Sequence, residues 1–104
     1  MKINCECGWV IPDITDGVPN KAYLIPDQDW ETLWDSIDDA IENPGSTPKE
    51  REARCMALRQ LRLFRTLWQC PGCGQLFIDD QKYELQLFVP RSPETSKSIL
   101  ARNQ

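Results

Sequence analysis

Two short cysteine-containing stretches lie far apart in the chain and together carry its clearest chemistry. Cys5 and Cys7 belong to the stretch CECG, and Cys70 and Cys73 belong to CPGCG. Four thiolates are a ligand set that structural Zn²⁺ sites use, arranged as a tetrahedron. A glycine follows each pair, and glycine adopts the positive φ that lets backbone amides turn toward sulfur. The sequence therefore predicts one zinc site to which both pairs contribute.

The two stretches also resemble a known kind of metal site. Each resembles the rubredoxin-type zinc knuckle, and the two together look like a zinc ribbon with a large insertion, although only nine of the 104 residues carry the likeness. The resemblance implies Zn²⁺ as the cofactor and a small β-sheet around it. The CECG stretch departs from the pattern, because one residue instead of two separates its cysteines. The first knuckle is therefore the weaker half of the prediction.

Two other uses of the cysteines remain open. A C-x-x-C pair can be a redox dithiol, but such a pair stands at a helix N-terminus, whereas QLFIDD after CPGCG is typical of a strand. The cysteines can also be unrelated buried side chains. Cys55 lies in a predicted helix away from both pairs, and as a small half-buried hydrophobic residue it is given no role.

The composition argues against an enzyme. The chain has no histidine, which removes the commonest general base near neutral pH. A zinc ion held by four cysteines has no open position for water or substrate. The adjacent carboxylates Asp38–Asp39 and Asp79–Asp80 point in different directions on a helix or strand, so neither pair can easily share one substrate. We therefore expect a non-catalytic protein.

Length and composition indicate a single α+β domain. The 104 residues suit one domain with knuckle halves at 1–25 and 68–90, a helical insertion at 26–67 and a tail at 91–104. No apolar run approaches the ~20 residues that span a membrane, and the first residues lack the pattern of a secretory signal. We therefore expect a cytoplasmic protein. In such a reducing compartment closely spaced cysteines more often bind metal than form disulfides.

The first helix is predicted at residues 27–42. One face of it carries apolar side chains at steps of three and four, namely Trp30, Leu33, Trp34, Ile37 and Ile41. Asp27 is the expected N-cap. The same stretch has no basic residue and seven acidic ones, which are Asp27, Asp29, Glu31, Asp35, Asp38, Asp39 and Glu42.

The second helix should begin with Thr47 as its N-cap and Glu50 completing a capping box, and it should run from Pro48 to about residue 64 or 66. Short strands are expected at 9–15 and 21–26. The segments QLFID and YELQLFV should form a hairpin after the second knuckle. The tail should be extended at its start and loose at its end, although SKSILA could add a helical turn.

Arginines gather on one side of the predicted second helix. Arg51, Arg54, Arg62 and Arg65 fall within about 80° on a helical wheel, with Arg59 at the margin. They can meet the acidic helix in an antiparallel hairpin, where each surface pair adds only ~0.2–1 kcal/mol. They can also form a stripe that binds nucleic acid, in which case Phe77 and Phe88 could stack on bases.

We favour a protein-binding module over a nucleic-acid-binding zinc ribbon, because the net charge is −4. The expected partner is a basic protein, with no nucleic acid and no membrane. The face of this chain that binds the partner is predicted on acids of the first helix, which are Asp35, Asp38, Asp39 and Glu42. Glu31 is left unassigned. In size and charge the chain is similar to bacterial immunity proteins that neutralise basic nuclease toxins, and the acidic helix is what suits such a partner.

Overall fold

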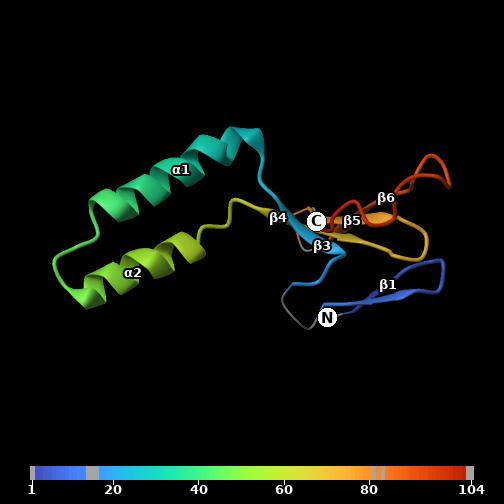
Figure 1. The fold of residues 1–104 in the computed structure, drawn as a ribbon, viewed down its shortest axis with the longest axis horizontal. Coiled ribbons are helices and arrows are strands. Elements are labelled where there is room, and N and C mark those ends of the chain that lie inside the picture. Colours follow the sequence, from blue (N-terminus) through green and yellow to red (C-terminus); the bar gives the residue numbers. More distant parts are fainter. Residues whose placement is uncertain (1, 14–16, 81, 83, 103–104) are drawn as a thin grey trace. The chain divides into compact units, whose positions relative to one another are not determined.

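The computed structural model describes residues 2–13, 17–80, 82 and 84–102, and its fold is α+β, which confirms the predicted class (Figure 1). Its elements in chain order are β1 (Lys2–Asn4), β2 (Val10–Pro12), β3 (Lys21–Leu24), α1 (Asp27–Glu42), α2 (Pro48–Arg59), β4 (Arg65–Gln69), β5 (Leu76–Asp79) and β6 (Leu85–Phe88). The predicted strand at 9–15 is observed as β2, and its last two residues lie outside the described part of the chain.

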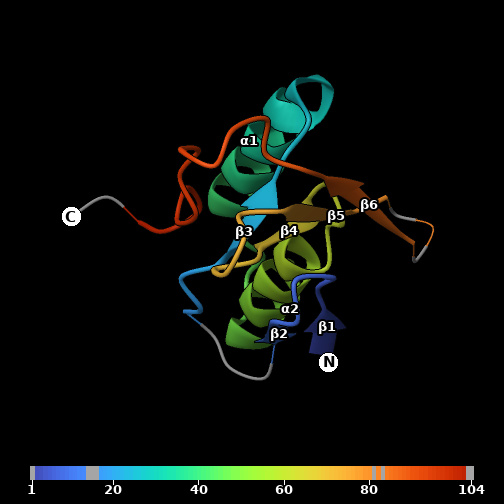
Figure 2. The ribbon, with the colours of Figure 1, turned by 90° about the vertical axis from the view of Figure 1, so that its right-hand side faces the viewer.

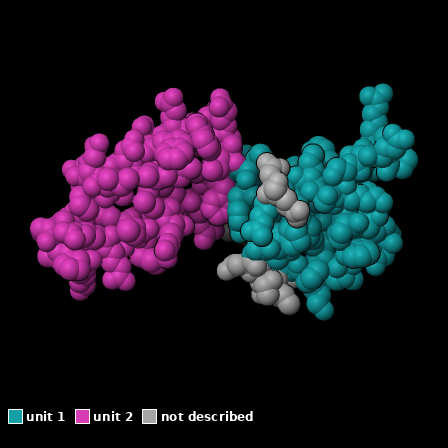
Figure 3. All heavy atoms as spheres, in the orientation of Figure 1, with its two compact units in different colours: residues 1–24, 65–104 teal, residues 25–64 magenta. Residues whose placement is uncertain are grey.

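The chain divides into two compact units, coloured separately in Figure 3. Unit 1 consists of residues 1–24 and 65–104, and unit 2 consists of residues 25–64. Unit 1 contains β1 to β6 and both cysteine pairs, whereas unit 2 contains α1 and α2. Among the described residues, neither unit has a helix with the length and apolar character needed to cross a lipid bilayer.

Unit 1 is built from antiparallel strands. β1 pairs with β2, and the larger sheet has the order β3-β4-β5-β6, which can be followed across Figure 2. Ile3 stands opposite Ile11 in the small sheet, and Trp68 stands opposite Phe77 in the large one. Side chains alternate between the two faces of a strand, and these four all face inward into one buried cluster. Two of the cysteines are buried in the same cluster.

Asp13 links the small sheet to the large one. It follows β2, and its Oδ1 accepts a hydrogen bond of 2.9 Å from the ammonium group of Lys21 on β3. Its Oδ2 accepts a second bond of 3.3 Å from the indole N–H of Trp68 on β4. The bond from Lys21 holds the pKa of Asp13 below its usual value. Both carboxylate oxygens are therefore used to join the sheets.

The buried amide of Gln69 holds the C-terminal tail. Its Nε2 donates to the carbonyl oxygens of Gly74 at 3.2 Å and Ser96 at 2.9 Å, and its Oε1 accepts from the backbone N–H of Ile99 at 2.9 Å. Buried polar groups need such partners, because an unsatisfied one costs stability. The prediction that the end of the tail is loose is therefore wrong for residues 96–99.

Unit 2 is a pair of antiparallel helices joined by residues 43–47 (Figures 1 and 2). α1 has the predicted bounds, but its N-cap is Pro26 and no side chain caps it, so the prediction for Asp27 is wrong. The cap of α2 is confirmed, since Thr47 Oγ1 accepts from the backbone N–H of Glu50 at 3.1 Å. The Glu50 carboxylate accepts in turn from the backbone N–H of Ser46 at 2.6 Å, and this bond lowers its pKa.

α2 ends earlier than predicted, at Arg59. Residues 65–69 instead form β4, which pairs with β3 on one side and β5 on the other and buries Leu67 and Trp68. Strand pairing and burial outweigh the helix-compatible spacing of these apolar residues. Arg62 and Arg65 therefore do not lie on α2, and the predicted arginine stripe is wrong.

Candidate metal centre

The first cysteine pair lies in the turn between β1 and β2. The backbone N–H of Cys5 donates to the carbonyl of Trp9 at 2.9 Å, and the N–H of Gly8 donates back to the carbonyl of Cys5 at 3.0 Å. Gly8 has a φ of 96°, a conformation that side chains other than glycine adopt at a cost. This turn presents Cys5 from inside the core and Cys7 from its exposed rim.

The second pair lies in the turn between β4 and β5, and the same two kinds of backbone bond close it. The N–H of Cys70 donates to the carbonyl of Gln75 at 2.9 Å, and the N–H of Gly74 donates to the carbonyl of Cys70 at 2.8 Å. Gly74 has a φ of 84°. Between the hydrogen-bonded residues, the second turn has one residue more than the first. The longer turn accommodates the C-x-x-C spacing of Cys70 and Cys73, and the shorter turn accommodates the C-x-C spacing of Cys5 and Cys7.

The two turns bring all four cysteines of the predicted site together. Their Sγ atoms lie within 4.8 Å of one another. Cys5 Sγ lies 3.5 Å from Cys73 Sγ, and Cys7 Sγ lies 3.5 Å from Cys70 Sγ. A tetrahedral ion with bonds of about 2.3 Å to sulfur requires sulfur atoms about 3.8 Å apart. The donor set and its dimensions therefore fit one metal ion held by both turns.

The thiols of the cluster differ in burial and in pKa. Cys5 and Cys70 are buried, and burial raises the pKa of both, for Cys5 to about 12. Cys7 is exposed, and a hydrogen bond from the backbone N–H of Trp9, followed by contact with the Cys70 thiol, lowers its pKa to about 7. Burial disfavours thiolates unless a cation lies beside them. A metal ion is the partner that would keep four sulfurs deprotonated here.

Two side chains border the sulfur cluster. The amide oxygen of Gln75 lies 3.5 Å from Cys5 Sγ inside the core. The indole of Trp9 covers Gly72 of the other turn so closely that a Cβ at this glycine would lie 3.0 Å from Trp9 Cε3 and 3.4 Å from Cys7 Sγ. The two turns thus contact each other through more than their sulfurs, which narrows the positions that the cysteines can take.

Other residues singled out by sequence lie away from this cluster. Cys55 lies on α2 in unit 2, apart from the four clustered cysteines, and it is exposed, so the expectation that it is half-buried is wrong. The predicted binding acids Asp35, Asp38 and Glu42 are exposed on α1. Asp39 is also exposed and forms an ion pair of 3.1 Å with Arg54. Among the described residues, this is the one ion pair between α1 and α2.

The sequence pattern did not identify Gln69 and Gln75 as residues that support the site, because a glutamine carries no charge and belongs to no metal-binding motif. One signal lay in their position, since they stand immediately before and after the segment CPGCG. Polar residues that flank a turn and alternate into a core must be hydrogen-bonded there.

The chain belongs to the family described as Domain of unknown function (DUF8617), whose model matches residues 1–95. The match includes both cysteine turns, α1 and α2. No curated protein and no solved structure matches the chain.

Proposed function

We propose that the four cysteines bind one Zn²⁺ ion that stabilises unit 1 and takes no part in a reaction. Tetrahedral sulfur donors suit zinc or iron, and the resemblance of the turns to zinc knuckles favours zinc. Cysteine would fill every coordination position, so the ion would have none left for a substrate. Such an ion supplies folding free energy, on the order of 10 kcal/mol in small zinc domains.

For the protein as a whole, the proposed function is non-catalytic binding of a basic protein through α1. The observation that carries this proposal is the unbalanced charge of that helix: it has seven acids and no base, and Asp39 alone among them has an ion-pair partner in the described residues. A basic toxin or effector, bound as an immunity protein binds its target, is the partner type that the size and charge suit.

The helix dipole supports a cationic partner. Asp38, Asp39 and Glu42 lie near the C-terminus of α1, and the last turn contains no basic residue. The negative end of the dipole makes acids there unfavourable by about 0.3–1 kcal/mol each. Lysines and arginines from a bound partner would offset that cost, so this unfavourable term would favour binding. Opposite charges would also speed the encounter.

The test compares two doubly charge-reversed proteins. Asp35→Lys with Asp38→Lys changes the proposed face, and Glu84→Lys with Glu94→Lys changes exposed acids of unit 1 by the same net charge. Wild-type protein captures partners from a lysate of its host, and the association rate of a captured basic protein is then measured with each variant. We expect association to slow at least about tenfold for the α1 variant alone. Equal slowing by both pairs, or none, contradicts the proposal.

The α1 variant should keep its fold, because exposed charges usually shift the free energy of unfolding by no more than ~0.5 kcal/mol. Thermal unfolding of both variants checks this. A large loss of stability in the α1 variant would mean that a change in binding cannot be assigned to the face itself.

The alternative, a zinc ribbon that binds nucleic acid, depended on an arginine stripe along the second helix. α2 ends at Arg59, so Arg62 lies in the segment after the helix and Arg65 lies in β4. Arg54 is paired with Asp39. Mixed-sequence DNA provides the check. Binding that persists at about 0.15 M salt and disappears with Arg51→Ala and Arg59→Ala would favour the alternative.

A further inference from the structure

α1 carries a stripe of large apolar side chains that α2 does not cover. Trp30 is 47%, Trp34 48% and Ile41 70% exposed. At 3.6 residues per turn the three lie within about 40° of one another around the helix. The two indoles are in edge-to-face contact, with centroids 5.8 Å apart. Aromatic side chains dominate the binding energy of many interfaces, so such a stripe is a candidate docking surface.

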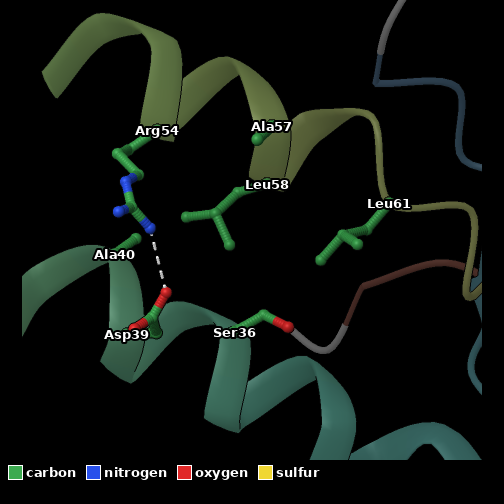
Figure 4. A pocket seen from close by; sticks show the side chains of 7 residues that line it. All are labelled: Ser36, Asp39, Ala40, Arg54, Ala57, Leu58 and Leu61. Carbon is green, nitrogen blue, oxygen red and sulfur yellow. Dashed lines mark hydrogen bonds and ion pairs between the residues drawn. The ribbon is translucent and has the colours of Figure 1, made fainter. Parts of the chain in front are cut away.

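The seam between the helices lies on another side of α1. Figure 4 shows Arg54 and Leu58 of α2 directed toward Asp39 and Ala40, around a hollow of about 180 Å³. The seam residues Ser36, Asp39 and Ala40 lie about 100–160° from the middle of the stripe around the helix. Neither helix has a buried residue. The pairing of α1 with α2 thus leaves about half of each indole and most of Ile41 open to another molecule.

Acids border the stripe on the flank between Trp34 and Asp39 of the seam, about 40–80° beyond Trp34 on a helical wheel. Asp38 lies one helical turn after Trp34, and Glu42 lies one turn after Asp38, so both follow the stripe along the helix axis. Glu31 falls on the same side. The surface is therefore a row of aromatic and aliphatic side chains beside a row of carboxylates, and these carboxylates form no ion pair among the described residues.

We infer that this surface docks an amphipathic helix of a partner protein, with apolar residues on one face and lysines or arginines beside them. The inference rests on the proposed function and names the chemistry of its partner. Apolar residues at helical spacing would cover the stripe, and the neighbouring basic residues would pair with Asp38 and Glu42. Specificity would come from matching both rows at once.

Charge selects this occupant over a second copy of the chain. Residues 25–64 contain nine acidic and five basic residues, whereas residues 1–24 and 65–104 contain seven of each. The formal net charge of −4, which counts only the acidic and basic side chains, thus resides in the unit that carries the stripe. Two such units repel each other. An anionic membrane surface or a nucleic acid would also be repelled by this unit.

The test uses the full-length, metal-loaded protein and two labelled synthetic peptides of 16 residues, the length of α1. One peptide places leucines at helical spacing among lysines, and the other has the same composition in an order that destroys the apolar face. Fluorescence anisotropy measures the affinity for each. We expect the amphipathic peptide to bind at least about tenfold more tightly. Trp34→Ala should remove about that factor for this peptide and change little for the other.

Met56→Ala is the matched control, because Met56 is similarly exposed, at 45%, on α2 and outside the stripe. It should leave both affinities unchanged, and circular dichroism should show equal helix content in both variants. If Met56→Ala weakens binding as much as Trp34→Ala does, the stripe has no special role and the inference is wrong.

The other outcomes separate this inference from the proposed function. The two peptides could bind with equal affinity, and the double variant Asp35→Lys with Asp38→Lys could lose that binding. This result would support binding through the acids and would overturn the role of the stripe. Failure of both peptides to bind would also overturn the inference, while capture of a basic host protein still decides the proposed function. A dimer in sedimentation that Trp34→Ala converts to monomer would identify a second copy as the occupant instead.

Discussion

The two units of this chain differ in their net charge and in whether they enclose a buried core. Unit 1 has balanced charge, a buried core of isoleucine, tryptophan and phenylalanine, and a cysteine cluster inside that core. Unit 2 carries the net charge of −4, and its helices bury no residue. Both units leave large apolar side chains at the surface, among them Phe88 and Val89 in unit 1 and Trp34 and Ile41 in unit 2. Among the described residues, unit 1 also encloses a buried core that includes cysteines of the sulfur cluster, whereas α1 and α2 enclose none.

The largest effect should follow from removing one cysteine of the cluster. Cys70→Ser deletes a proposed metal ligand from the core, so unit 1 should lose its tertiary structure. The expected cost in folding free energy is on the order of that of the proposed zinc site, ~10 kcal/mol. The fluorescence of buried Trp68 and near-ultraviolet circular dichroism measure this loss.

Cys55→Ser is the matched control for that change, because Cys55 is exposed on α2 and lies outside the cluster. It should alter stability by no more than ~0.5 kcal/mol. If Cys55→Ser unfolds unit 1 and Cys70→Ser does not, the cluster is not what holds that unit together.

Metal affinity should weaken steeply as pH falls. The raised pKa values of Cys5 and Cys70 mean that both thiols are protonated across the neutral range and must each release a proton to a metal. The association constant should therefore fall at least about 100-fold per pH unit. Below about pH 7 the Cys7 thiol is protonated too, so the slope should steepen there. Competition with a chromophoric chelator measures it, and a flat profile would contradict thiolate ligation.

A smaller effect is expected where the tail meets the second turn. Gln69→Ala leaves the carbonyls of Gly74 and Ser96 and the amide of Ile99 without their buried partner, at a cost of about 2–4 kcal/mol. Trypsin should then cut faster at Lys97. The control Gln28→Ala, at an exposed position of α1, should change neither property. Cleavage that is unchanged in Gln69→Ala would mean that the tail is held elsewhere.

The sequence predicted features that local chemistry determines. The cysteine turns follow from spacing and from glycine at positive φ, and the bounds of α1 follow from apolar residues at steps of three and four. The end of α2 was not predictable in this way. Residues 65–69 are spaced for either a helix or a strand, and their pairing with β5 and with β3, which lies more than 40 residues earlier, decides between them. The run TLWQ directly before CPGCG is the signal that favoured a strand.

Side-chain links between distant segments also lay beyond the sequence. Asp13 and Gln69 are single polar residues without a motif, and they acquire partners only when β2, β4 and the tail come together. A charge pattern showed that α1 is acidic, but its helical wheel alone could not show which side faces α2. That assignment required the fold.

The metal content of the protein purified without chelator tests the central claim most directly. Elemental analysis together with native mass spectrometry should find one zinc per chain, in a colourless protein, and the same in Cys55→Ser. Serine at Cys5, Cys7, Cys70 or Cys73 should each lower the zinc content well below one. Wild-type protein that contains far less than one equivalent of zinc, or that carries disulfides between the clustered cysteines, would contradict the account.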